Sequence, residues 1–124
     1  MELGAHTHTH ADFRGRPDAL ADDLEENLAV LRDRFDIEEP TFAFPYGTKR
    51  DGFASPELAS VVRQAGARCC LTTQRAIVRS GDNPFDWGRF AAEDHDTAAT
   101  LAGKLGGWYE AVRALGRRFR GNRF

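Results

Sequence analysis

Three of the four histidines in the chain stand at alternate positions near its N-terminal end, in the stretch ELGAHTHTH. Neutral imidazole is a good ligand for Zn²⁺, and two histidines with one carboxylate and a water form a common catalytic zinc shell. His6 and His10 are four positions apart, and a fully extended chain would hold them about 13 Å from each other. We therefore predict that a helical turn or a tight loop brings His6 and His10 onto one divalent cation, with Zn²⁺ as the expected metal, and that His8 points elsewhere.

Two other origins of such a histidine cluster stay open on spacing alone. A chance polar loop or the remnant of a purification tag would also concentrate histidines. Tags are usually uninterrupted histidine runs, whereas here Thr7 and Thr9 alternate with the histidines and an apolar stretch precedes them. Both threonines are placed to hydrogen-bond the backbone or neighbouring groups.

A second turn-rich segment lies where another apolar run stops. The β-prone residues 41–44 end at Pro45, and the sequence PYGTKRDGFAS that follows is rich in turn-forming residues. Parallel strands end at the same edge of a sheet, and α/β proteins bind their ligands at that edge. We expect the histidine segment and the PYG segment to lie beside each other there.

Alternating strands and helices are predicted to position these two loops. Residues 2–5, 41–44 and 67–73 are predicted to be short strands. A short helix is marked by Ser55 as its N-cap, Pro56 as its first residue and Gly66 as its stop. This order predicts an α/β fold with parallel strands. Two longer helices, residues 17–35 and a last one capped by Asp96 or Thr97, are predicted from apolar stripes at helical spacing: Leu20, Leu24, Leu28, Leu31 and Phe35, then Leu101, Leu105, Trp108, Val112, Leu115 and Phe119.

Length and composition describe a single soluble domain, residues 1–124. The net charge of −2 provides no general basic field that would attract nucleic acid. No segment approaches the roughly 18 apolar residues of a membrane span and no signal-peptide core is present, so the chain as written is expected to be cytoplasmic. A local basic run could contact phosphates or anionic lipid, although such runs are commonly solvated helix ends. Its members are Arg113, Arg117, Arg118, Arg120 and Arg123.

The two cysteines are adjacent in a predicted strand. Cys69 and Cys70 should therefore point to opposite faces of the sheet. This placement argues against a disulfide between them, and their spacing is not that of a metal-binding pair. We predict two small buried hydrophobic residues.

Taken together, the two motifs resemble those of the polysaccharide deacetylases (carbohydrate esterase family 4, the NodB-homology domain). ELGAHTHTH is similar to the second motif of that family, in which a strand delivers His, Ser/Thr, any residue, Ser/Thr, His. FAFPYG resembles the third motif, and a predicted helix separates the two motifs as in that fold. Residues 67–90 are similar to the later strand and loop of the same family, so the resemblance extends over residues 2–90.

This resemblance implies a partial, distorted (β/α) barrel that uses a divalent metal, usually zinc. The implied reaction is hydrolysis of acetyl groups on a polysaccharide or oligosaccharide, with N-acetyl expected before O-acetyl. In the site that the resemblance implies, His6 and His10 are metal ligands, and the backbone N–H of Tyr46 faces the oxyanion. Pro45 and Gly47 shape the substrate loop, and Arg89 orders the site.

The chain departs from the family pattern in ways that bear on activity. An aspartate pair supplies the general base and the third metal ligand in that family, and it is absent here, as is the arginine expected before Pro45. His95 lacks the preceding leucine of the motif that supplies the general acid, which favours a surface or capping role. General acid–base catalysis contributes about 10²- to 10⁴-fold in rate, so we expect this chain to be nearly inactive alone. Two histidines without the carboxylate ligand are also expected to bind zinc weakly.

Three functional hypotheses follow from the sequence. In the first, the chain is the C-terminal portion of a polysaccharide deacetylase, and it forms a homodimer or needs a missing N-terminal half because the strand edges of a partial barrel are unpaired. In the second, it is a non-catalytic metal- or glycan-binding module that kept the fold. The third, an α/β protein that contacts phosphates or nucleic acid through its basic tail, is not favoured because the basic run is too local. We expect neither a nucleic-acid partner nor a membrane span.

Overall fold

Helix α1 spans Pro17–Phe35 in the computed structural model, which describes residues 2–108 and 111–112. Proline fits the first helical position because its missing N–H would have no partner there. Asp36, in the left-handed conformation, ends the helix and donates its N–H to the carbonyl of Arg32. The inner side of α1 buries most of the predicted stripe, but Phe35 at the helix end is 53% exposed. The buried members are Leu20, Leu24, Leu28 and Leu31.

Two short parallel strands form the centre of the fold. Strand β1, Thr41–Ala43, pairs with strand β2, Cys69–Leu71, so that Phe42 lies opposite Cys70. Single parallel bridges add a segment on each side, Ala5 beside Phe42 and Trp87 beside Leu71. The predicted strand at residues 2–5 is therefore reduced to one bridge, and the strand predicted at residues 67–73 is shorter than expected.

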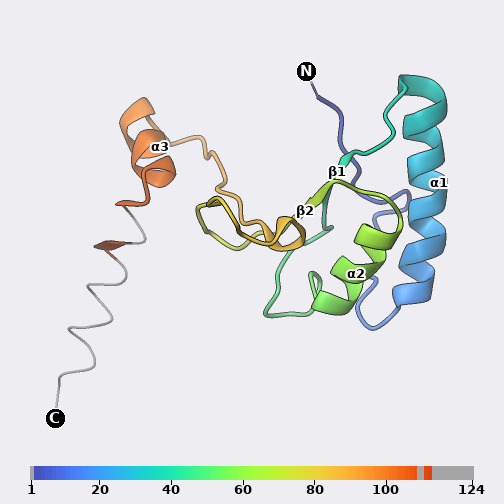
Figure 1. The fold of residues 1–124 in the computed structure, drawn as a ribbon. Coiled ribbons are helices and arrows are strands. Elements are labelled where there is room, and N and C mark those ends of the chain that lie inside the picture. The colour runs from blue at the N-terminus through green and yellow to red at the C-terminus, as the bar shows by residue number, and fades with distance from the viewer. Residues whose placement is uncertain (1, 109–110, 113–124) are drawn as a thin grey trace, which may run out of the picture.

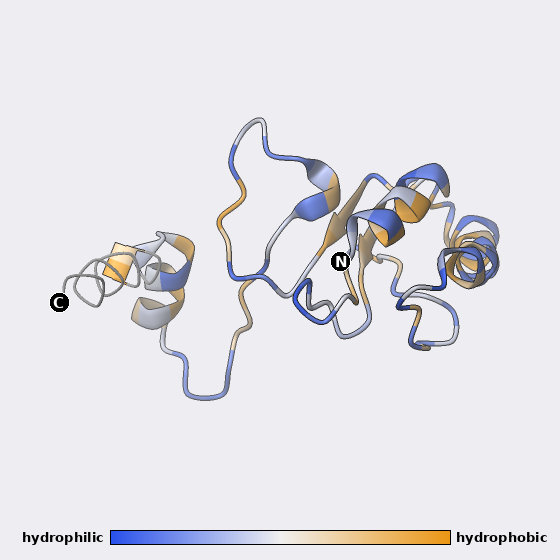
Figure 2. Ribbon diagram, turned by 90° about the horizontal axis from the view of Figure 1, so that it is seen from below, coloured by the Kyte–Doolittle hydropathy of each residue, from blue (hydrophilic) through white to orange (hydrophobic). Residues whose placement is uncertain are grey.

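Helix α2, Pro56–Gln64, packs with α1 on one side of these strands (Figure 1). The Ser55 hydroxyl caps α2 by accepting a hydrogen bond from the N–H of Leu58 at 3.2 Å, as the sequence predicted. Both helices connect parallel segments, and the usual right-handed form of such crossovers places them on the same face of the sheet. In Figure 2 the two strands are coloured as hydrophobic, whereas the surrounding loops are mostly hydrophilic.

The alternation of side chains along the strands determines which residues face the helices. Ala5, Phe42 and Cys70 lie side by side in neighbouring segments, and all three belong to the hydrophobic core beneath α1 and α2. Cys69 is also buried but lies outside this cluster, as the opposite orientation of adjacent strand residues requires. Burial raises the pKa of the Cys70 thiol to about 12, and both cysteines are free thiols, as predicted.

The last described helix, α3, spans Ala98–Leu105 and lies apart from α1 and α2 (Figure 1). The short 3₁₀-helix η1, Pro84–Asp86, lies in the chain between β2 and α3. Thr97 caps α3, one of the two residues predicted for that role, and it forms a capping box with Thr100. His95 is 81% exposed and lies 3.2 Å from Glu93, which agrees with a surface role. The end of the predicted stripe and the basic run at residues 113–123 lie outside the described residues.

The described residues confirm an α/β arrangement with parallel strands. The barrel implied by the sequence resemblance stays a prediction. In the part of the chain that the structure describes, no helix has the length and apolar character needed to cross a membrane.

Candidate functional site

A tight, irregular loop brings the first and last histidines of the cluster together. The backbone turns back through positive φ angles at Thr7 (67°) and His10 (56°). The hydroxyl of Thr7 accepts a hydrogen bond from the N–H of His10 at 3.0 Å, which closes the turn. The ring centroids of His6 and His10 are 4.9 Å apart, with an angle of 63° between the ring planes. The predicted convergence is thus achieved by a loop rather than by a helical turn.

One hydrogen bond determines which nitrogen of His6 is free. Nδ1 of His6 lies 2.7 Å from the carbonyl oxygen of Ala43, at the end of β1. A carbonyl oxygen only accepts, so Nδ1 carries the proton and the neutral ring keeps its lone pair on Nε2. Metal-binding histidines are commonly oriented in this way by a carbonyl or carboxylate on their other nitrogen. His6 is therefore arranged as an Nε2 ligand.

Asp23 of α1 holds the middle of the histidine loop, and sequence reasoning missed this role. One carboxylate oxygen accepts a hydrogen bond from the N–H of His8 at 2.6 Å, and the other accepts from the N–H and hydroxyl of Thr9 at 2.9 and 2.5 Å. The ring of His8 points elsewhere, as predicted: its Nε2 lies 3.6 Å from Oε2 of Glu26 on α1. The available signal was the position of Asp23 three residues after Leu20, on the buried stripe of α1.

Tyr46 lies in a strained turn next to the histidines. The N–H of Gly47 donates to the carbonyl of Pro45 at 2.6 Å, and Tyr46 between them has a φ of 61°. This three-residue turn with positive φ is rare in proteins, and strained backbone of this kind is concentrated at functional sites. Within the described part of the chain, the Tyr46 N–H donates no backbone hydrogen bond. The ring of Tyr46 is 5.1 Å from that of His10, centroid to centroid.

Position 47 requires a glycine for two reasons, its backbone conformation and the close approach of a second segment. Its φ is 63°, and a Cβ placed on it would lie 2.7 Å from Cγ2 of Thr73 and 3.4 Å from Nη2 of Arg89. The N–H of Thr73 donates to the Gly47 carbonyl at 2.9 Å, which joins the loop after β1 to the loop after β2. The guanidinium of Arg89 therefore lies next to Gly47, in the PYG turn.

The structure thus gathers the predicted site residues at one end of the strands. Two contacts link the histidines to β1 and to the loop after it, one between His6 and Ala43 and one between His10 and Tyr46. Among the described residues, no group of three or more His, Cys, Asp or Glu side chains is arranged to hold a metal ion. The oriented His6 ring and the 4.9 Å separation from His10 fit two ligands of one cation, and the remaining ligands would have to come from water, substrate or another chain segment.

Comparison with known proteins bears on the fold. Comparison with models of protein families found no match. No curated protein matched either. Among solved structures, the chain is similar to the structure of IcaB from Ammonifex degensii, with a TM-score of 0.67 and 24% sequence identity. The similarity covers 82% of this chain and 46% of that chain, so this chain spans less than half of its structural neighbour. At this identity the likeness concerns the fold.

Proposed function

We propose that this chain provides the metal-binding and oxyanion-binding part of a polysaccharide deacetylase, with His6 and His10 as ligands of a divalent cation, expected to be Zn²⁺. The observation that carries the proposal is the placement of the oriented His6 ring, the His10 ring and the strained Tyr46 turn at one end of the parallel strands. The order of the two motifs and the fold likeness to IcaB support it.

The chain's own residues would act on an acyl group at this place. A bound divalent cation supplies Lewis-acid polarisation of the acyl carbonyl. The N–H of Tyr46 is preorganised to donate to the oxygen on which negative charge develops, and one such donor typically contributes about 10²- to 10³-fold in rate. Pro45 and Gly47 hold that N–H in place, and Arg89 keeps the turn oriented from the neighbouring loop. An N-acetyl group on a polysaccharide is the expected substrate.

The incomplete ligand set favours a second candidate function. Because no third His, Cys, Asp or Glu ligand joins the two histidines among the described residues, a metal- or glycan-binding module without catalytic activity fits the same geometry. We expect the chain alone to release no measurable acetate from N-acetylated oligosaccharides. Acetate release by this chain alone, abolished by H10Q, would exclude the non-catalytic alternative.

Zinc titration of the purified chain tests the proposed metal site directly. We expect a single site whose affinity falls by at least about tenfold in H6Q and in H10Q, because each loses a ligand nitrogen. The matched control is H8Q, since His8 belongs to the same loop but its ring points toward Glu26. Equal affinities in H6Q, H10Q and H8Q, or no zinc binding by the unaltered chain, would overturn the metal site.

A further inference from the structure

Contacts between rings continue from the histidine pair across the loop after β1. The ring of Phe53 lies beside that of Tyr46, with centroids 4.8 Å apart and an interplanar angle of 44°. The guanidinium carbon of Arg14 lies 4.2 Å from the centroid of the same Phe53 ring. Phe53 is partly buried and packs toward the core, whereas Tyr46 is 53% exposed. One ring therefore supports an exposed aromatic side chain and an exposed cation next to each other.

Asp12 fixes the orientation of the Arg14 guanidinium. Nε of Arg14 donates to Oδ1 of Asp12 at 3.0 Å and Nη2 donates to Oδ2 at 2.6 Å, in the forked geometry typical of such pairs. The Arg14 N–H donates to the same carboxylate at 3.0 Å, so the pair is held by backbone as well as side chain. These hydrogen bonds lower the pKa of Asp12, which stays ionised near neutral pH. About half of each side chain is exposed.

The loop that carries Phe53 is also closed by its own hydrogen bonds. Phe53 and Gly52 donate their N–H groups to the carbonyls of Thr48 and Lys49 at 3.0 and 3.1 Å. The hydroxyl of Thr48 donates to Asp51 at 3.0 Å. A surface built in this way loses little conformational freedom when a ligand binds, which favours affinity.

We propose that Tyr46, Arg14 and Asp12, supported by Phe53, form a binding subsite for a sugar ring of the polysaccharide next to the one that carries the reacting acetyl group. A pyranose presents an apolar C–H face and a rim of hydroxyls. The Tyr46 ring offers a flat apolar surface for the first, while Arg14 and Asp12 offer a donor and an acceptor for the second. The contact between Tyr46 and His10 makes this surface continuous with the metal-binding histidines.

This subsite deepens the proposed function and rests on it for the nature of the ligand. The tetrasaccharides of N-acetylglucosamine with β-1,4 and with β-1,6 linkages are suitable probes, titrated into the isotopically labelled chain and followed by NMR. We expect shifts at Tyr46, Phe53 and Arg14, and binding about three- to tenfold weaker in Y46L and in R14M, which lose the ring and the donor. Y46L retains the backbone N–H, so it isolates the side chain.

Controls separate this inference from the metal proposal and from a merely structural role. F35L alters an exposed aromatic residue at the far end of α1 and should leave sugar binding unchanged. Circular dichroism should show Y46L and R14M folded, and R14M should bind zinc as the unaltered chain does. Sugar binding equal in Y46L, R14M and F35L, or no binding of either tetrasaccharide at millimolar concentration, would overturn the subsite. If the subsite were overturned in this way, loss of zinc binding in H6Q and H10Q would still support the metal site. If the chain bound sugar but no zinc, the metal site would be refuted and the subsite would stand.

Discussion

A single carboxylate on α1 controls the shape of the histidine loop. Asp23 is buried, and its two oxygens accept three hydrogen bonds from His8 and Thr9. These contacts hold the centre of the loop against α1, while the bond from His10 to Thr7 closes it. The convergence of His6 and His10 therefore depends on a residue that touches neither ring.

We predict that D23N destabilises the fold and weakens zinc binding. The substitution places an amide NH₂ against backbone N–H donors, and loss of a hydrogen bond to a charged acceptor costs about 2 kcal/mol. A loosened loop should lower zinc affinity by about tenfold, as seen when residues that orient metal ligands are removed. Urea unfolding and zinc titration measure the two effects.

The matched control for Asp23 is its exposed neighbour on the same helix. D22N makes the same change in charge, but Asp22 lies on the solvent side of α1. We expect D22N to leave both the free energy of unfolding and the zinc affinity nearly unchanged. If D22N and D23N behaved alike, net charge rather than the loop contacts would explain the effect.

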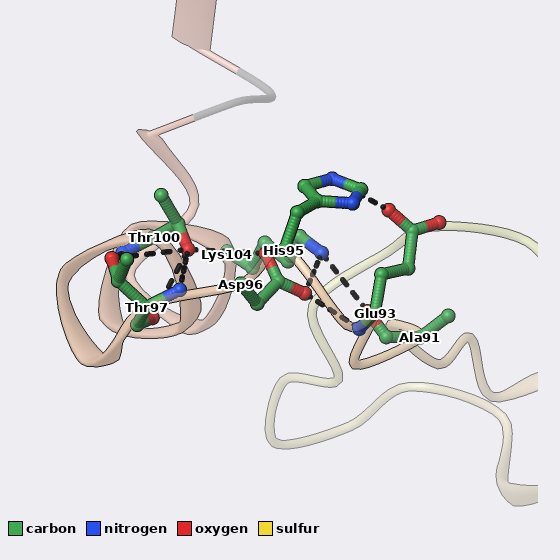
Figure 3. A network of polar contacts seen from close by, with 7 residues as sticks. All are labelled: Ala91, Glu93, His95, Asp96, Thr97, Thr100 and Lys104. Carbon is green, nitrogen blue, oxygen red and sulfur yellow. Dashed lines mark hydrogen bonds and ion pairs between the residues drawn. The ribbon is translucent and has the colours of Figure 1, made fainter.

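At the scale of elements, polar contacts attach α3 to the segment that precedes it. Figure 3 shows Asp96 between Lys104 and the backbone of Glu93. Nζ of Lys104 lies 2.5 Å from the Asp96 carboxylate and donates to the carbonyl of Ala91 at 3.0 Å. Hydrogen bonds from Lys104 and then from the Glu93 N–H lower the pKa of Asp96 from 3.8 to about 2.

The pKa of Asp96 predicts how acid affects α3. A carboxylate whose pKa is lowered by folding stabilises the folded state above its ordinary pKa, and this contribution is lost as the pH falls toward the folded value. Protection of the amides of residues 98–105 against hydrogen exchange should therefore decrease between about pH 4 and pH 2. D96N should lower protection already at pH 5 and remove this pH dependence.

D94N serves as the control for D96N, because Asp94 is exposed and lies two residues earlier in the chain. We expect its exchange profile to follow that of the unaltered chain from pH 5 to pH 2. A decrease in protection that persists in D96N with the same midpoint would show that another carboxylate is responsible.

The elements differ in how far local sequence could predict them. Helices α1 and α2 begin at the predicted residues because Pro17, Ser55 and Pro56 act through short-range geometry. The strand expected at residues 2–5 is only one bridge at Ala5, since strand length depends on a partner far away in the chain.

The sequence predicted which residues of the candidate site lie close together, but not the backbone conformation that brings them there. The histidine spacing and the PYG turn indicated which residues converge. The positive φ of Tyr46 could not be predicted, because it is maintained by the contact of Gly47 with Thr73, 26 residues further along the chain. The role of Asp23 was hidden for the same reason: its partners are brought to α1 only by the folded loop.

At the scale of the whole molecule, apolar side chains remain exposed in the region of α3. Leu105, the last residue of α3, and Trp108 and Val112 beyond it belong to the apolar stripe predicted from the sequence, and they are 72%, 67% and 47% exposed. Single exposed apolar residues are normal on protein surfaces, but several of them close together along the chain favour an interaction surface. This region contacts earlier segments of the chain at Lys104, which donates to the carbonyl of Ala91, and at Gly107, which lies close to Ile77.

We predict that the chain self-associates through this stripe. Because burial of a large apolar side chain contributes about 1.5–3 kcal/mol, W108E should shift the molecule toward monomer at tens of micromolar, measured by sedimentation equilibrium. V30E is the control, since Val30 is an exposed apolar residue on α1, 37% accessible and outside the stripe. We expect V30E to associate like the unaltered chain. A monomeric unaltered chain, or equal association of W108E and V30E, would contradict an interface at this stripe.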